Sequence, residues 1–165
     1  MKNGVRLVLL ALAAGLAFWL WTVLFPSPEK LVLRKISQLA ATACISAKDS
    51  SLARAGKATS LVGDFANDAE IVITATEIGS RTLSGRDEIR EAALGGFATL
   101  SALNVQFMDT VARVGADQQT AQVTCTARVN DCDSKDFGIQ EMRFRLKKID
   151  GTWLITRAET VKTLQ

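Results

Sequence analysis

With 165 residues, no histidine and only three cysteines, this chain has few of the side chains from which metal sites and disulfide frameworks are built. Its formal net charge is +3. Without Lys2 and Arg6 near the amino terminus, the rest of the chain has 18 basic and 17 acidic side chains, which nearly cancel. That balance excludes the clustered basic surface of a nucleic-acid binder. We therefore expect no nucleic-acid partner, no metal and no cofactor.

The first pattern along the chain is an uncharged apolar run at residues 7–25, with Lys2 and Arg6 before it and Pro26 and Pro28 after it. As a helix, this run would reach about 28 Å, close to the hydrocarbon thickness of a bilayer. It predicts a transmembrane signal anchor in contact with membrane lipid. A cleaved secretory signal is the alternative, although the run continues well past the small residues near its start.

The anchor divides the chain into four parts. We expect a short tail at residues 1–6, the anchor at 7–25, a connector at 26–28 and one domain at 29–165. The first positive charges of a short amino-terminal tail usually stay in the cytoplasm. This orientation places the carboxy-terminal domain on the far side of the membrane.

Helical periodicity predicts three helices in the first part of the domain. Residues 29–47 carry apolar side chains at helical spacing, and residues 51–65 do so after a cap-like Asp-Ser pair. A segment rich in β-branched residues, 69–76, predicts the first strand. The third helix is expected to begin with Ser84 as its cap and to end near Leu100.

Four further β-type segments complete the chain, and turn residues such as Asp150-Gly151 separate them. They span residues 103–114, 120–130, 138–149 and 152–163. Helices followed by a meander of strands predict an α+β fold, in which three helices pack on one face of a curved antiparallel sheet.

Three stretches of this chain resemble motifs of the nuclear transport factor 2-like superfamily, including its SnoaL-like polyketide cyclase branch. They are Gly63–Ala69 at the turn into the first strand, Leu83–Ile89 at the entry to the third helix, and Asp150–Ile155 at the hairpin before the last strand. The resemblance covers residues 29–163. It implies a cone-shaped domain whose curved sheet wraps a cavity, and that cavity is catalytic, ligand-binding or filled in different members.

Strand alternation predicts which side chains face the inside of such a cone. Phe107 shares a face with Asp109 and Arg113, so we expect Asp109 to point inward with Arg113 beside it. A carboxylate in an apolar pocket can act as a general base, the role that the resemblance implies for isomerase and dehydratase relatives. The expected lining of the pocket consists of inward-facing apolar residues: Phe107, Cys125, Met142, Phe144 and Trp153.

The alternative for Asp109 is a structural ion pair with Arg113 or Arg90. Isomerase and dehydratase relatives use Tyr or His beside their acid, and this chain contains neither residue type. The sequence thus favours binding over catalysis.

The opposite face of the strands is polar. It carries Thr124 and Arg128 on one strand and Arg143 and Arg145 on the next. In antiparallel sheets, a polar face of this kind usually faces solvent. Family members often dimerise through this face, so the resemblance also implies a homodimer in which these four residues meet their copies.

Two classes of function follow. In the first, the chain is a non-enzymatic binding or scaffold subunit of a bacterial envelope or membrane complex. This arrangement is similar to the membrane-anchored periplasmic components of type IV secretion systems, and it implies a span in the bacterial inner membrane, a cytoplasmic amino terminus and a periplasmic domain.

In the second class, the cone binds a small hydrophobic ligand, or converts it as a SnoaL-like isomerase, dehydratase or cyclase that uses Asp109 as a general base. An open cavity lined by Asp109 would favour this second class. A cone filled by the apolar side chains of its own strands would favour the first.

Overall fold

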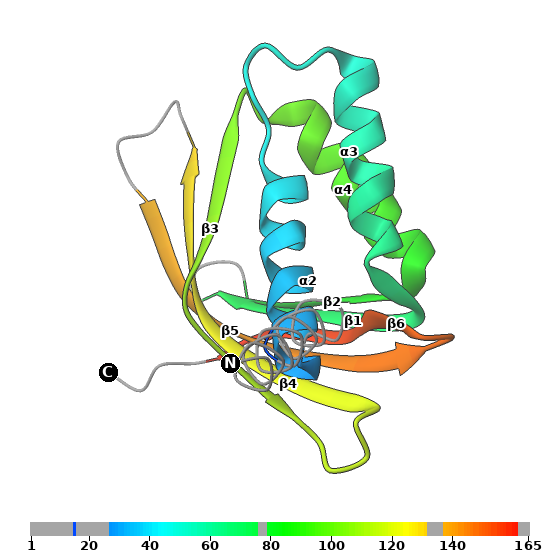
Figure 1. The fold of residues 1–165 in the computed structure, drawn as a ribbon. Coiled ribbons are helices and arrows are strands. Elements are labelled where there is room, and N and C mark those ends of the chain that lie inside the picture. The colour runs from blue at the N-terminus through cyan, green and yellow to red at the C-terminus, as the bar shows by residue number, and fades with distance from the viewer. Residues whose placement is uncertain (1–14, 16–26, 76–78, 132–136, 162–165) are drawn as a thin grey trace, which may run out of the picture.

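The computed structural model describes residue 15 and residues 27–75, 79–131 and 137–161. Figure 1 shows helices packed against one side of a strongly curved sheet, which confirms the α+β prediction. The elements, in chain order, are α2 (Pro28–Ala43), α3 (Ser51–Gly63), β1 (Phe65–Ala75), β2 (Gly79–Ser84), α4 (Gly85–Thr99), β3 (Leu103–Val114), β4 (Thr120–Asp131), β5 (Phe137–Ile149) and β6 (Thr152–Thr160).

The predicted anchor at residues 7–25 lies outside the described residues, apart from residue 15. Among the residues that the structure does describe, no helix is both long enough and apolar enough to cross a bilayer. The anchor therefore stays a prediction.

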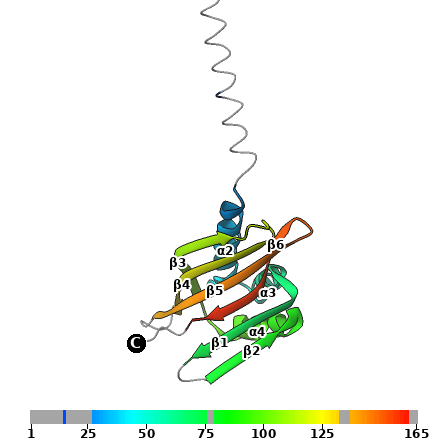
Figure 2. The same cartoon turned by 90° about the horizontal axis from the view of Figure 1, so that it is seen from below.

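The strands form one sheet in the order β2-β1-β6-β5-β4-β3, seen from below in Figure 2. Neighbouring strands are antiparallel except β1 and β6, which run parallel with Ile71 beside Ala158. The prediction of a wholly antiparallel sheet is wrong at this junction. The hairpin partner β5 already occupies one edge of β6, so β1 takes the other edge and meets it in the same direction.

Strand β2 is absent from the prediction. Its sequence, Gly-Ser-Arg-Thr-Leu-Ser, contains a single apolar residue, Leu83, and therefore lacks the alternation of a half-buried strand. It forms because it pairs along β1, where Leu83 lies beside Ile71 and Arg81 beside Ile73. This edge strand runs next to α4 and supplies one wall of the pocket described below.

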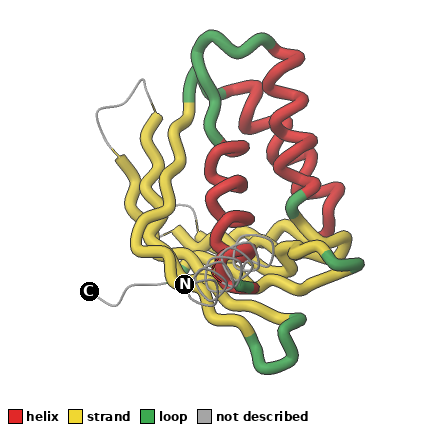
Figure 3. Tube along the Cα trace, viewed as in Figure 1, coloured by secondary structure: helices red, strands yellow, loops and turns green. Residues whose placement is uncertain are grey.

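The core lies in the concavity of the sheet, where α2, α3 and α4 gather (Figure 3). Ser27 caps the amino end of α2, and its Oγ accepts a hydrogen bond from the Lys30 backbone N–H at 3.4 Å. It buries Val32, Ile36 and Leu39, which recur at helical spacing, against the strands. Full burial of a side chain of this size contributes roughly 1.5–3 kcal/mol, so this stripe holds α2 in place.

Two arginines fix α4 at both of its ends. At the carboxyl end, Arg54 of α3 donates to the carbonyl oxygens of Phe97, at 3.1 Å, and of Leu100. At the amino end, Arg86 donates to the carbonyl oxygen of Phe65 at 3.2 Å. The last carbonyls of a helix have no partners within it and form the negative end of its dipole, so the Arg54 cation satisfies both needs.

Candidate functional site

The apolar residues predicted to line the cone lie in its packed interior. Cys125, Phe144 and Trp153 are buried, and Phe107 and Met142 pack against the same core. The rings of Phe107 and Phe144 meet edge to face with centroids 5.4 Å apart. These residues face inward as expected, but they fill the region beneath α2 with contacts to one another. A role in ligand binding is untested for them.

Burial also decides the chemistry of Cys125. Desolvation raises the pKa of its thiol to about 11, because the thiolate loses its contact with water. A thiol with so high a pKa is almost wholly protonated at neutral pH. Buried and protonated, Cys125 packs in the core as a small apolar side chain.

The predicted position of Asp109 and Arg113 inside the cone is wrong, because strand β3 contains a β-bulge. The pairing with β4 shifts between Met108 and Val111, so that Asp109 and Thr110 together lie opposite one residue. Asp109 takes a left-handed conformation with φ of 51°, which Asp tolerates better than most residues. Beyond the bulge the alternation is reversed.

The reversal puts Arg113 on the outer face, where it is exposed, and leaves Asp109 exposed at the bulge itself. Val111, which lies two residues from Asp109 and two from Arg113, is 53% exposed as well. Asp109 does line a hollow of about 320 Å³, which it shares with outer-face residues such as Thr124, Glu141 and Arg143 and with the inward-facing Cys125 and Met142. A catalytic role for Asp109 and Arg113 stays untested, and the buried setting on which it depended is not present.

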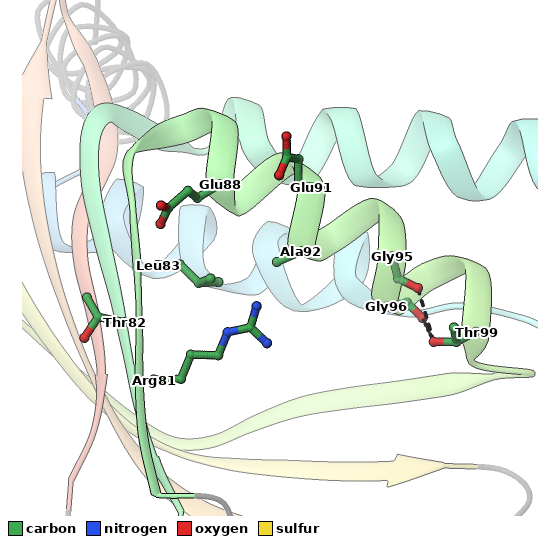
Figure 4. Close-up of a pocket in the computed structure, with 9 residues that line it drawn as sticks. All are labelled: Arg81, Thr82, Leu83, Glu88, Glu91, Ala92, Gly95, Gly96 and Thr99. Atoms are coloured by element: carbon green, nitrogen blue, oxygen red, sulfur yellow. Dashed lines mark hydrogen bonds between the residues drawn. The ribbon is translucent and has the colours of Figure 1, made fainter.

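A larger pocket of about 760 Å³ lies between β2 and α4 (Figure 4). We call it the β2–α4 pocket. Its volume is within the range typical of small-molecule sites. One wall comes from the edge strand, with Arg81 and Leu83, and the other from α4. The residues of α4 that line it are Glu88, Glu91, Ala92, Gly95, Gly96 and Thr99.

The α4 wall owes its shape to two adjacent glycines. A Cβ placed on Gly95 or Gly96 would meet nothing within 4 Å outside its own helix. The two residues therefore leave space where other helical residues would project side chains. The Thr99 hydroxyl donates to the carbonyl oxygens of Gly95, at 3.2 Å, and Gly96, at 3.1 Å. These bonds occupy backbone acceptors at the same wall.

The charged groups at this pocket differ in whether they already have hydrogen-bond partners. The Glu88 carboxylate accepts a hydrogen bond from the Ser84 backbone N–H at 2.6 Å and so serves the amino end of α4. The predicted cap, the side chain of Ser84, makes no capping bond. Arg81, by contrast, forms no hydrogen bond or ion pair with any residue that the structure describes.

The sequence does not predict this pocket, because it does not predict β2, the strand that forms one of its walls.

The outer face of the sheet carries a chain of ion pairs that crosses three strands. Glu159 of β6 accepts from Arg143 of β5 at 3.1 Å and from Arg157 at 2.9 Å. Arg157 in turn pairs with Glu70 of β1 at 2.5 Å. Hydrogen bonds from Arg157 and then Arg143 lower the pKa of Glu159, and the same bond to Glu159 raises the pKa of Arg157.

The predicted dimer residues lie on this outer face. Thr124 is beside Arg143, and Arg145 is beside Arg157. Arg128 lies further along β4, beside the exposed Ile139. Within the described part of the chain, no group of three or more Cys, Asp or Glu side chains is arranged to hold a metal ion.

Fold and pocket together define a small α+β cone of the nuclear transport factor 2-like type. The chain belongs to the SnoaL-like domain family, whose family model matches residues 34–159. No curated protein sequence matches the chain significantly.

Solved structures share the fold at low sequence identity. A nuclear transport factor 2-like protein with a cystatin-like fold from Novosphingobium aromaticivorans superposes with a TM-score of 0.63 at 20% identity, over 90% of this chain and 86% of that one. A candidate scytalone dehydratase from the same species gives 0.59 at 17% identity, over 82% and 83% of the two chains. A candidate aromatic ring hydroxylase, also from that species, gives 0.62 at 13% identity, over 83% and 90%.

Proposed function

We propose that this domain works by binding a small amphipathic molecule in the β2–α4 pocket, without converting it. The observation that carries the proposal is the pocket itself. Its volume of about 760 Å³ is bounded by an apolar side chain, a glycine pair and a guanidinium without a partner among the described residues. Thr82, Glu88, Glu91, Ala92 and Thr99 complete the lining. The volume lies within the range of small-molecule sites.

Binding is favoured over catalysis because the acid–base groups at hand are weakly placed for chemistry. Asp109 is exposed on the outer side of the sheet, and Glu88 is engaged with the backbone of Ser84. The chain also has no Tyr or His to act beside either acid. The candidate dehydratase and hydroxylase among the similar structures share the fold at under 25% identity, which carries no activity across.

A screen of small aromatic and aliphatic compounds against the full-length chain, read by ligand-observed NMR, tests the proposal. We expect hits that are lost in Gly96→Leu, because the leucine side chain would occupy the pocket. The matched control is Gly56→Leu in α3, where a Cβ also meets nothing within 4 Å but which lies outside the pocket lining. Hits that bind Gly96→Leu as well as wild type would overturn the proposal.

A second candidate function is association of two copies through the outer sheet face. Val111 and Ile139 are 53% and 57% exposed there, beside alternating acidic and basic side chains that two copies can match. Sedimentation of full-length protein in detergent should show a dimer that Val111→Glu and Ile139→Glu weaken. Leu52→Glu in α3, also at a highly exposed apolar residue, is the control and should leave the dimer intact.

We also propose that residues 7–25 anchor the chain in a membrane, with the domain on the periplasmic side. The support is the uncharged apolar run between basic residues and prolines. Alkaline carbonate extraction of cell membranes should leave the protein in the pellet. Release of a chain shortened ahead of Glu29 into the wash would contradict the proposal. Neither fold nor comparisons support a place in an envelope complex, so none is proposed.

A further inference from the structure

We infer that the β2–α4 pocket selects an organic anion, a small carboxylate with a flat apolar body, and that Arg81 is the residue that recognises it. The inference rests on the proposed binding function and goes beyond it by naming the class of ligand.

Arg81 lines the pocket from β2, where its side chain is exposed. It lies two residues before Leu83, which packs against the core, so both side chains are on the inner face of β2. Figure 4 shows its guanidinium extending from β2 toward the middle of α4. A planar guanidinium with five donors matches a carboxylate in two parallel hydrogen bonds, which makes an unengaged arginine a natural anion site.

The other arginines near α4 are already engaged. Arg54 donates to carbonyl oxygens at its carboxyl end, Arg86 donates to Phe65, and Arg90 pairs with Asp87 at 2.7 Å. Arg81 has no such bond to any described residue, although it borders the same helix. Its donors are therefore available to a ligand.

The acidic residues of the pocket do not neutralise Arg81. No carboxylate oxygen of a described residue lies within 4.0 Å of its guanidinium, and Glu88 is bonded to the Ser84 N–H. Figure 4 shows the Glu91 carboxylate on the side of α4 away from Arg81. The carboxyl end of α4, whose dipole would repel an anion, is covered by the Arg54 cation.

The wall opposite Arg81 suits a flat apolar body. Ala92 presents apolar atoms there, and Gly95 and Gly96 present backbone without side chains, so an aromatic ring can lie close against α4. Leu83 adds apolar atoms from the β2 side. A ligand with an acid at one end and one or two fused rings at the other would fill the pocket and pair with Arg81 simultaneously.

Matched probes test the inference with the full-length chain in detergent. Isothermal titration with 2-naphthoate and with 2-naphthalenemethanol compares an acid with a neutral compound of the same ring system. We expect the acid to bind at least tenfold more tightly than the alcohol. Arg81→Gln should weaken the acid about ten- to hundredfold and leave the alcohol unchanged, since a hydrogen bond to a charged group contributes on that scale.

Two controls separate the outcomes. Arg113→Gln removes an exposed arginine on the outer face and should bind both probes like wild type, with circular dichroism confirming the fold of each variant. If both probes bind equally and Arg81→Gln changes neither, while Gly96→Leu abolishes binding, the anion preference is wrong and the proposed binding function stands. If Gly96→Leu changes the binding of neither probe and of no screened compound, both the proposed binding function and the anion preference are wrong.

Discussion

The two halves of the sheet are built for different tasks. Beneath α2, strands β5 and β6 send Phe144, Leu146 and Ile155 into a core where each is at most 2% exposed. Beside α4, the edge strand β2 sends one apolar residue, Leu83, and one cation, Arg81, toward a helix wall with two glycines. The first half is closed by side chains, whereas the second leaves a pocket.

The difference shows how one fold can be both stable and open. Burial of large apolar side chains in the closed half stabilises the whole domain. This stabilisation offsets the free-energy cost of a cavity in the other half. On the outer face, the ion pairs from Arg143 through Glu159 and Arg157 to Glu70 join the halves across β5, β6 and β1. Changes in each half should therefore have different consequences.

The largest effect is expected from the closed half. Phe144→Ala should lower the free energy of unfolding by about 3–5 kcal/mol, because it removes a ring that is 2% exposed and packed on Phe107. Urea unfolding followed by circular dichroism measures this change. A loss below about 1 kcal/mol would mean that the region beneath α2 is not the packed core described above.

A buried ion pair between the helix layer and the start of β1 comes next. Lys35 Nζ lies 2.5 Å from Asp64 Oδ1, and the Asp64 side chain is only 7% exposed. Asp64→Asn should cost about 3 kcal/mol, because it leaves the half-buried Lys35 charge without its partner. The double variant with Lys35→Met should recover part of this loss. If the double variant is as unstable as the sum of the two single ones, the pair is not coupled.

The junction of the two halves can be tested with pH. The arginine partners of Glu159 lower the pKa of its carboxyl group in the folded state. The ionised form therefore stabilises the folded state at pH values above about 4.5, the ordinary pKa of the group. This contribution disappears as the pH falls through the lowered pKa of the folded state. Glu159→Gln should therefore be less stable than wild type at pH 7, by about 1 kcal/mol or less, and equal to it near pH 2. Urea midpoints at both pH values measure the difference. A constant gap across this range would show that the charge is not responsible.

The same contrast explains which parts of the structure could be read from the sequence. Helices and long strands were predicted within a few residues, because their apolar side chains recur at the period of a helix or a strand. The closed half depends on that periodicity, and Phe107, Phe144 and Cys125 face inward as expected. The strand β2 has no such pattern, since its pairing with β1 and not its own sequence makes it a strand.

The site failed to be predicted for two local reasons. The bulge at Asp109 reverses the inward and outward alternation of side chains along β3. One extra residue in a strand has no pattern of its own, so the bulge could not be located from the sequence. The pocket depends on a wall made by β2 and on side chains that are absent from Gly95 and Gly96. The available signal was a glycine pair in the last turns of an otherwise amphipathic helix. Glycine inside a helix lowers its stability, so its presence points to a packing or functional reason.

The smallest prediction tests that cost directly. Gly95→Ala should raise the free energy of unfolding by about 0.5–1 kcal/mol, because alanine favours the helix and its Cβ meets nothing within 4 Å. Gly56→Ala in α3 has equal room and should stabilise the chain by a similar amount. Thermal unfolding of both variants, with 2-naphthoate binding measured alongside, separates helix propensity from function. If Gly95→Ala alone reduces binding, the glycine is there to admit a ligand; if both variants are stabilised and bind like wild type, the open wall has no such role.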